Sequence, residues 1–440
     1  MDLAPNWVRT QWTLESTDER QSGAFLFSAY MFRIGLALVT FEQVRPFGIM
    51  LSDYCFFLSL LVILPSVKSQ FWKSTGTGVL LGGTLILFGA LLSLVNESDR
   101  SGSVVPLTKL FILYGLLAPL AILHSKDVRR NMLYLVAGIF VNCAITILQA
   151  SVFPEIVDVL SINPLTPDES EILRYQGLTQ FPVTLGLSAA LAVLIGIGLM
   201  LFENSRYVRW SLAFLTLICA GAALLSGSRI VLAALIPGLL VLALLLKQRR
   251  RMVVRGLITV CIITGGIAYL LPNVLEQFSN RLEDVGLVDY GRLIVAAQAL
   301  LEIAQKPIFG WGVNHFSEAG LTLFPGMYGN EPQGAHVTLL QYWYGAGLLG
   351  ATGFLALFAV PVRRMVQALR KKLPADSSNA VRLILACYVS IFIIFNLGPY
   401  FFNRYLYMPM FAFAGFIAGR LKSAEAHLAL QQQAGGRSGL

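Results

Sequence analysis

Charged side chains are scarce in this sequence. Only 13% of its 440 residues are Asp, Glu, Lys or Arg, whereas 56% are hydrophobic. Soluble domains carry roughly twice this charged fraction, so the composition argues against a soluble globular protein. Apolar runs of about 20 residues, the length that spans a bilayer as a helix, recur along the chain. The composition therefore predicts an integral membrane protein.

Cysteine and histidine are also rare, with five and four residues. Each cysteine falls inside an apolar run, and their spacing fits neither a disulfide framework nor a metal-ligand motif. His315 and His336 are too far apart in sequence for a compact ligand pair. Neither a Gly-rich phosphate loop nor a nucleophile elbow is present. We therefore expect no metal and no other cofactor.

The apolar runs predict an all-α polytopic membrane protein with about 12 transmembrane helices and a helical loop domain outside the membrane. The beginning of the chain, residues 1–22, lacks the features of a signal peptide. The expected helices are 23–43, 47–66, 77–95, 104–123, 131–152, 181–202, 208–225, 228–246, 253–271, 337–361, 381–397 and 405–419.

Most lysines and arginines fall in the loops on one side of these helices, together with both termini. By the positive-inside rule that side is cytoplasmic. The excess of positive charge thus sets the topology and requires no nucleic-acid partner. The chain is expected to divide into transmembrane helices 1–9 (1–271), a large loop on the non-cytoplasmic side with an amphipathic helix (272–336), helices 10–12 (337–420) and a cytoplasmic tail (421–440) that is polar and mobile.

The large loop contains a helical pattern from Tyr290 to Gln305, with Asp289 as the expected N-cap. Arg292 would then lie in the first turn, where a cation opposes the helix dipole. An anion site formed by the arginine and free backbone N–H groups would explain this placement. Pairing of Arg292 with Asp289, or contact with the membrane interface, is an equally weighted explanation.

Arg229 has the same expected geometry, because Ser228 can cap the helix that follows it. Alone, an arginine at this place is more often an interfacial anchor. Two such arginines on one side of the membrane favour a shared diphosphate ligand, since guanidinium groups fit phosphate oxygens. Arg174, in the other long outer loop, is a third candidate, although nearby acidic residues offer it partners.

His336 stands where the large loop meets the tenth expected helix. The N-terminus of a helix disfavours imidazolium, and a neutral imidazole near pH 7 suits a general base. For a lone histidine, a simple cap or a bond to a loop carbonyl is the commoner role. Arg404 and Asp53 are weaker candidates, as are Arg33 and Lys109, because ionisable residues in or near apolar spans are functional suspects by default.

Taken in order, these residues resemble the motifs of the O-antigen ligase and O-antigen polymerase superfamily of bacterial membrane glycan transferases. The resemblance covers roughly residues 170–350. Its elements are Leu51-Ser52-Asp53, Arg174 with Gly177, Ser228-Arg229, Arg292 ahead of Pro307-Ile308-Phe309-Gly310-Trp311-Gly312, and His336 followed by Leu339, Gly345 and Gly350. The chain departs from the family at Val337, where Asn or Ser is usual.

The resemblance implies a GT-C-like membrane enzyme that transfers a glycan from undecaprenyl diphosphate on the periplasmic side of the inner membrane. A ligase uses a sugar hydroxyl of lipid A–core as acceptor, whereas a polymerase uses a second lipid-linked repeat. Neither is expected to need a metal. His336 would be the general base, and Arg229, Arg292 and Arg174 would hold the diphosphate. We favour the ligase.

A glycolipid flippase or other transporter is the alternative from a different class. It would need a polar path reachable from both sides, or paired charges within the membrane. The candidate polar residues instead gather on one expected side, and Asp53 with Lys109 is the only loose pair. No internal repeat with interrupted helices is evident. The sequence therefore favours an enzyme.

Overall fold

The computed structural model describes residues 23–64, 77–97, 101–161, 175–228, 230–246, 285–313, 337–370, 375–398 and 402–437, with four isolated positions between 254 and 266. Regular structure in these ranges is helical. The helices of the first half are α1 (Gly23–Leu38), η2 (Pro46–Gly48), α2 (Leu51–Ile63), α4 (Thr77–Ser93), α5 (Val104–Leu110), η4 (Phe111–Leu117), α6 (Ala118–Leu123), η5 (His124–Asp127), α7 (Val128–Ser151) and α8 (Ile156–Leu160). Those of the second half are α9 (Pro182–Phe202), α10 (Arg206–Leu225), α11 (Ile230–Leu245), α14 (Val285–Gln305), α16 (Thr338–Arg370), α17 (Ala375–Asn396) and α18 (Arg404–Arg437).

The expected apolar ranges coincide with these helices, except for 253–271, which lies outside the described residues apart from its isolated positions. Within the described ranges, five helical stretches are long and apolar enough to cross a membrane, and several shorter helices are also apolar. The protein is therefore a multi-pass, all-helical membrane protein. The total of 12 spans stays a prediction.

Helix α9 forms the centre of one half of the bundle. Every residue of α9 except Val183, Met200 and Phe202 is buried, as expected for a helix that is apolar all round. Its neighbours are α7, α10, α11 and α17. A second close pairing joins α4 to α16, where a methyl group at Gly82 would lie 2.6 Å from the Gly353 carbonyl oxygen. Small residues of this kind let two helix backbones approach closely.

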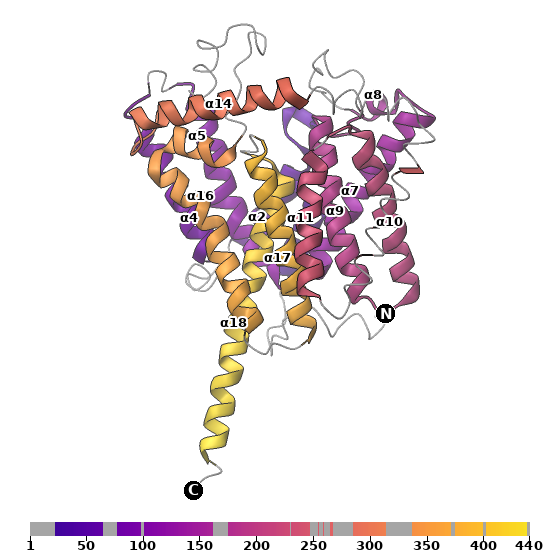
Figure 1. The fold of residues 1–440 in the computed structure, drawn as a ribbon. Coiled ribbons are helices and arrows are strands. Elements are labelled where there is room, and N and C mark those ends of the chain that lie inside the picture. The colour runs from indigo at the N-terminus through magenta and orange to yellow at the C-terminus, as the bar shows by residue number, and fades with distance from the viewer. Residues whose placement is uncertain are drawn as a thin grey trace.

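Helix α14 lies across one end of the bundle, whereas α18 projects beyond the opposite end (Figure 1). Val295, Ala299 and Ile303 of α14 form a small core with Tyr344 of α16. After α14 the chain docks on a kink in α16 at Gly347, which has a φ of 64°. There the Leu348 N–H donates to the Ile308 carbonyl at 3.1 Å. The Pro-x-x-Gly-x-Gly element thus fixes α14 against α16.

Two expectations about helix ends are corrected. The loop helix begins at Val285 rather than after Asp289, because nothing in the apolar stretch before Asp289 interrupts a helix. The last expected helix was to end at residue 419, but α18 continues as a helix to Arg437. Its alanine-, leucine- and glutamine-rich sequence has strong helix propensity, which explains the extension.

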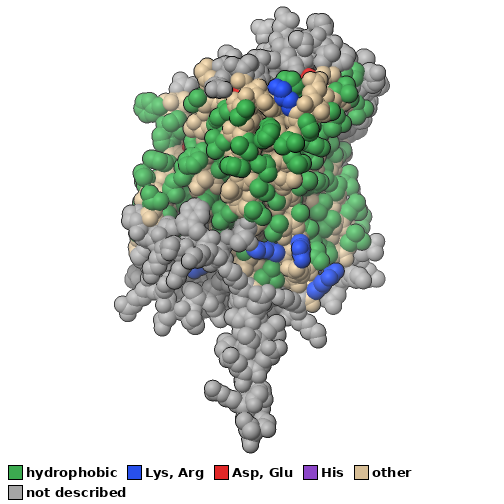
Figure 2. Space-filling view, turned by 90° about the vertical axis from the view of Figure 1, so that its left-hand side faces the viewer, with side chains coloured by type: hydrophobic (Ala, Val, Ile, Leu, Met, Phe, Trp, Pro, Cys, Tyr) green, Lys and Arg blue, Asp and Glu red, His purple; other side chains and the backbone are tan. Residues whose placement is uncertain are grey.

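The surface divides into an apolar middle and polar ends. Hydrophobic side chains cover the middle of the face drawn in Figure 2. The described lysines and arginines on that face lie near its ends, mostly at the end from which α18 projects. This arrangement suits a protein that sits in a bilayer with its polar ends at the two membrane surfaces.

Candidate functional site

The described residues include only part of the site expected from the sequence. Arg174, Arg229 and His336 lie outside them. Arg292 is described as part of the α14 backbone alone. The expected convergence of Arg229, Arg292 and His336 therefore stays a prediction.

The position of Arg292 differs from the expectation. Because α14 begins at Val285, Arg292 is beyond the first helical turn and Asp289 is inside the helix rather than at its N-cap. The argument from the helix dipole therefore no longer applies to Arg292. By helical spacing, position 292 shares a face with Val295, Ala299 and Ile303, the face that packs on α16.

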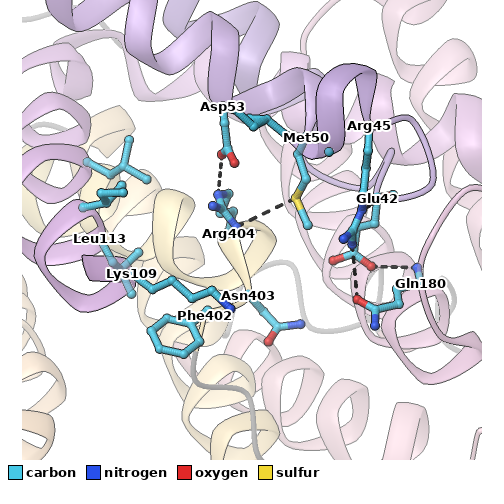
Figure 3. Close-up of a pocket in the computed structure, with 14 residues that line it drawn as sticks. Glu42, Arg45, Met50, Asp53, Lys109, Leu113, Gln180, Phe402, Asn403 and Arg404 are labelled. Carbon is cyan, nitrogen blue, oxygen red and sulfur yellow. Dashed lines mark hydrogen bonds and ion pairs between the residues drawn. The ribbon is translucent and has the colours of Figure 1, made fainter. Parts of the chain in front are cut away.

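Asp53 and Arg404, the two weaker candidates, lie together in a pocket of about 410 Å³ (Figure 3). This volume falls within the range of roughly 300–1,000 Å³ that is usual for small-molecule sites. The pocket lies where four separate stretches of the chain meet. Its lining residues are Glu42, Arg45, Gly48, Ile49, Met50, Asp53, Lys109, Ile112, Leu113, Leu117, Gln180, Phe402, Asn403 and Arg404.

Asp53 is in the first turn of α2, and Arg404 is the first residue of α18. Arg404 Nε and Asp53 Oδ1 form an ion pair. The contact lacks hydrogen-bond geometry, and neither atom has a hydrogen-bond partner among the described residues. The other contact of the guanidinium is Nη1 to the Met50 sulfur at 3.8 Å, a weak acceptor. Most of the donor capacity of Arg404 is therefore unused in the described part of the chain.

On the opposite wall, Glu42 holds the segment that precedes α9. The Gln180 backbone N–H donates to Glu42 Oε2 at 2.8 Å, and Arg45 Nη2 donates to Gln180 Oε1 at 3.3 Å. Burial raises the pKa of the Glu42 carboxyl, while the Gln180 hydrogen bond and the charges of Arg45 and Arg404 oppose that rise. These contacts fix Gln180 and Arg45 at the edge of the pocket.

Gly177 explains how the chain reaches Gln180. It has a φ of 55°, and a side chain there would collide with Asn142 and Thr146 of α7. The next N–H, of Leu178, donates to Asn142 Oδ1 at 2.7 Å. The Arg-x-x-Gly element therefore includes a structural glycine that binds the segment to α7 just before it enters the pocket.

Lys109 approaches from a third side. It is in the last turn of α5, immediately before the π-helical segment η4. Its Nζ lies 5.5 Å from the centre of the Phe402 ring, a cation–π contact. In Figure 3 the ammonium group points toward Asn403. Single π-helical turns inside α-helices are frequent at functional sites, and here one borders the pocket.

Three buried tyrosines connect the pocket to the start of α16. The Tyr342 hydroxyl is 2.6 Å from that of Tyr114 and 2.9 Å from that of Tyr407. Tyr114 and Tyr407 are each within two helical turns of a pocket residue, Lys109 and Arg404 respectively. Tyr342 lies within the same sequence distance, two helical turns, of position 336. The network therefore holds α16, η4 and α18 in register below the pocket.

Sequence reasoning did not identify Glu42, Arg45 or Gln180. The first two belong to a short polar connection between two apolar runs, and this was the available signal. Gln180 followed the Arg-x-x-Gly element and gave no signal of its own. Lys109 was noted only as an ionisable residue near an apolar span. Among the described residues, no group of three His, Cys, Asp or Glu side chains could hold a metal ion.

Comparison with known proteins gives one family match. The family model described as O-antigen ligase matches residues 212–355. No curated protein matches the chain. The matched range begins in α10 and ends within α16, so it includes the positions of Arg229, Arg292 and His336. Over this range the match confirms the resemblance to the O-antigen ligase and polymerase superfamily that the sequence shows.

Proposed function

We propose that the protein is an O-antigen ligase. It transfers a glycan from undecaprenyl diphosphate to a sugar hydroxyl of lipid A–core, on the periplasmic face of the bacterial inner membrane and without a metal. The observation that carries this proposal is the O-antigen ligase family match over residues 212–355, a range that holds the expected base and two expected diphosphate ligands. An O-antigen polymerase that acts on lipid-linked repeats is the alternative, because the family match fits it equally.

In the proposed mechanism, His336 removes the proton of the acceptor hydroxyl, and the hydroxyl oxygen attacks the anomeric carbon of the donor. The bond from that carbon to the diphosphate breaks, so a single displacement inverts the configuration. Arg229 and Arg292 bind the diphosphate and stabilise the charge that it gains as it leaves. Arg174 orients the donor or the acceptor.

The proposed topology places both termini in the cytoplasm and the reaction at the α14 end of the bundle. Residues 1–271 and 337–420 hold the transmembrane helices, 272–336 form the periplasmic loop, and 421–440 form a cytoplasmic tail. The gathering of described lysines and arginines toward the α18 end supports this orientation. Labelling of single cysteines at the two ends in intact cells tests it.

Reconstitution with purified lipid-linked glycan tests the activity. Lipid A–core and a second lipid-linked repeat are offered separately as acceptors. Glycan on lipid A–core supports the ligase. Elongation of the lipid-linked glycan alone would instead identify a polymerase, and movement of the donor across the bilayer without transfer would identify a flippase.

Substitutions at the expected site test the roles. Arg229→Lys keeps the charge but loses the forked geometry that fits phosphate, so transfer should fall. Transfer at the wild-type rate in this variant would show that position 229 needs only a positive charge and not the forked guanidinium. Arg292→Ala tests whether a position beyond the first turn of α14 still reaches the donor.

A further inference from the structure

The pocket at the α2 and α18 N-termini has a polar end that is unusually rich in cations. Arg45, Lys109 and Arg404 approach it from three different elements. Two carboxylates, Glu42 and Asp53, also line it. One Glu42 oxygen already accepts the Gln180 N–H. Both α2 and α18 begin at the pocket, and the N-terminus of a helix favours an anion.

The Asp53–Arg404 pair is open to a ligand. Both side chains are about one-fifth exposed, at 22% and 23%. The pair lacks hydrogen-bond geometry, and only the Met50 sulfur accepts a hydrogen bond from the guanidinium among the described residues. Lys109 is exposed, and its ammonium group makes a cation–π contact with the Phe402 ring. Arg404 therefore keeps N–H groups beyond its ion pair with Asp53, and both cations have donors for a phosphate oxygen.

The other side of the pocket is apolar and open. Ile49 and Ile112 line the cavity and are 48% and 37% exposed. Phe57 of α2 and Phe111 of η4, on the elements that carry the two walls, are 58% and 56% exposed. Exposed apolar side chains on a membrane helix suit contact with lipid chains. The pocket thus combines a cationic end with apolar lining residues, on elements that also carry exposed apolar side chains.

We propose that this pocket binds the phosphate or diphosphate group of a lipid, with Lys109 and Arg404 as direct ligands. The lipid chain then runs along the exposed apolar side chains of α2 and η4. Arg45, held by Gln180 and by the Glu42 carbonyl, adds positive charge at the edge. The identity of the lipid as the glycan donor rests on the proposed function. Binding of a phosphorylated lipid does not.

Binding of glycan-free lipids to the purified full-length protein tests the inference. The probes are undecaprenyl diphosphate, undecaprenol and inorganic pyrophosphate, each measured by its dissociation constant in detergent. Lys109→Ala and Arg404→Gln should each weaken binding of undecaprenyl diphosphate at least about ten-fold, the loss expected for one charge-assisted hydrogen bond. Undecaprenol binding should be unchanged. Pyrophosphate should bind more weakly than the lipid but lose affinity in the same variants.

Arg382→Ala is the matched control, because Arg382 is a half-buried arginine of α17 outside the pocket, with Asn379 as its hydrogen-bond partner at 3.2 Å. It should bind all three probes like the wild type. Arg404→Lys, which keeps the charge, should bind the diphosphate better than Arg404→Gln. Wild-type affinity for undecaprenyl diphosphate in both Lys109→Ala and Arg404→Gln would overturn the proposal, as would dependence on these residues for pyrophosphate but not for the lipid.

The test is independent of glycan transfer. His336→Ala should bind undecaprenyl diphosphate like the wild type, because the proposed ligands in this pocket are Lys109 and Arg404. If His336→Ala still transfers glycan while Lys109→Ala loses binding, the proposed mechanism fails and the pocket stands. If His336→Ala is inactive while the pocket variants bind undecaprenyl diphosphate like the wild type, the pocket assignment fails and the proposed mechanism stands.

Discussion

Arg33 of α1 and Arg404 of α18 each pair with an aspartate, but their surroundings differ. Near η5, Asp127 accepts from Arg33 at 3.2 Å and pairs with Arg130 at 3.2 Å, and Asn131 accepts from Arg33 at 3.3 Å. These groups satisfy one another. At the pocket, Arg404 meets Asp53 without hydrogen-bond geometry beside open space. The same residue types thus stabilise the structure in the Arg33 cluster and are available to a ligand at the pocket.

Two histidines offer the largest contrast. His336→Ala should reduce transfer by at least about 100-fold, because general-base catalysis contributes typically 10²–10⁴-fold. Its unfolding temperature should match that of the wild type. Transfer assays with lipid-linked donor, alongside thermal unfolding in detergent, measure both. Substantial transfer by the variant would remove the base assignment.

His124→Ala should behave in the opposite way. His124 is buried, lies 5.3 Å from the ring centres of both Phe25 and Phe32, and its Nε2 is 2.9 Å from Ser28 Oγ. Losing this packing and hydrogen bond should destabilise the fold by about 2–4 kcal/mol. Transfer per folded molecule should not change. A variant that unfolds at the wild-type temperature but loses transfer would contradict the structural role of His124.

Gly177→Ala and Gly227→Ala form a matched pair. Both glycines have positive φ, 55° and 60°, but only Gly177 has atoms close to the position of an added methyl group. Backbone strain alone should cost each variant about 1–3 kcal/mol. Gly177→Ala should cost more and should also weaken binding of undecaprenyl diphosphate, because the segment ending at Gln180 would shift. Equal losses of stability and binding in the two variants would show that the close approach to α7 is unimportant.

Arg33→Gln tests the structural cluster directly. Losing the contacts to Asp127 and Asn131 should lower stability by about 1–2 kcal/mol, since the pair is only partly exposed. Binding of undecaprenyl diphosphate should stay at the wild-type value. Weakened lipid binding in a folded Arg33→Gln protein would break the comparison between the two clusters.

The smallest expected effect concerns Glu42. Burial raises its pKa in the folded protein, so the folded state favours the protonated carboxyl. The stability that this group contributes is fully present below its unfolded pKa, about 4.3, and is lost as pH rises through the raised folded value. Glu42→Gln should remove this loss, so that between about pH 4 and neutral pH the unfolding temperature of the variant should fall less than that of the wild type. The same dependence of unfolding temperature on pH in both proteins would contradict the raised pKa of Glu42.

The helices could be predicted because their signal is local. Apolar runs such as 104–123 and 181–202 match the described helices almost residue for residue. Helix ends were less predictable. Asp289 is a plausible cap by residue type, yet α14 continues through it, since local capping energies of about 1 kcal/mol do not outweigh an uninterrupted helical stretch.

The pocket was mostly out of reach of sequence reasoning. Asp53 and Arg404 were flagged only as charges near apolar runs, and nothing in the sequence brings them together. Their pairing depends on how α2 and α18 pack, and the place of Gln180 depends on the hydrogen bond to Glu42. Contacts between residues this far apart have no local pattern.

By itself, the sequence determined the membrane class, the helix positions and the resemblance to a superfamily, because hydropathy and ordered motifs are properties of neighbouring residues. Only the tertiary structure decided which charges satisfy one another and which face a cavity. The reason is physical: Arg33 and Arg404 have the same chemistry, and what separates them is the set of groups that folding places within hydrogen-bond reach.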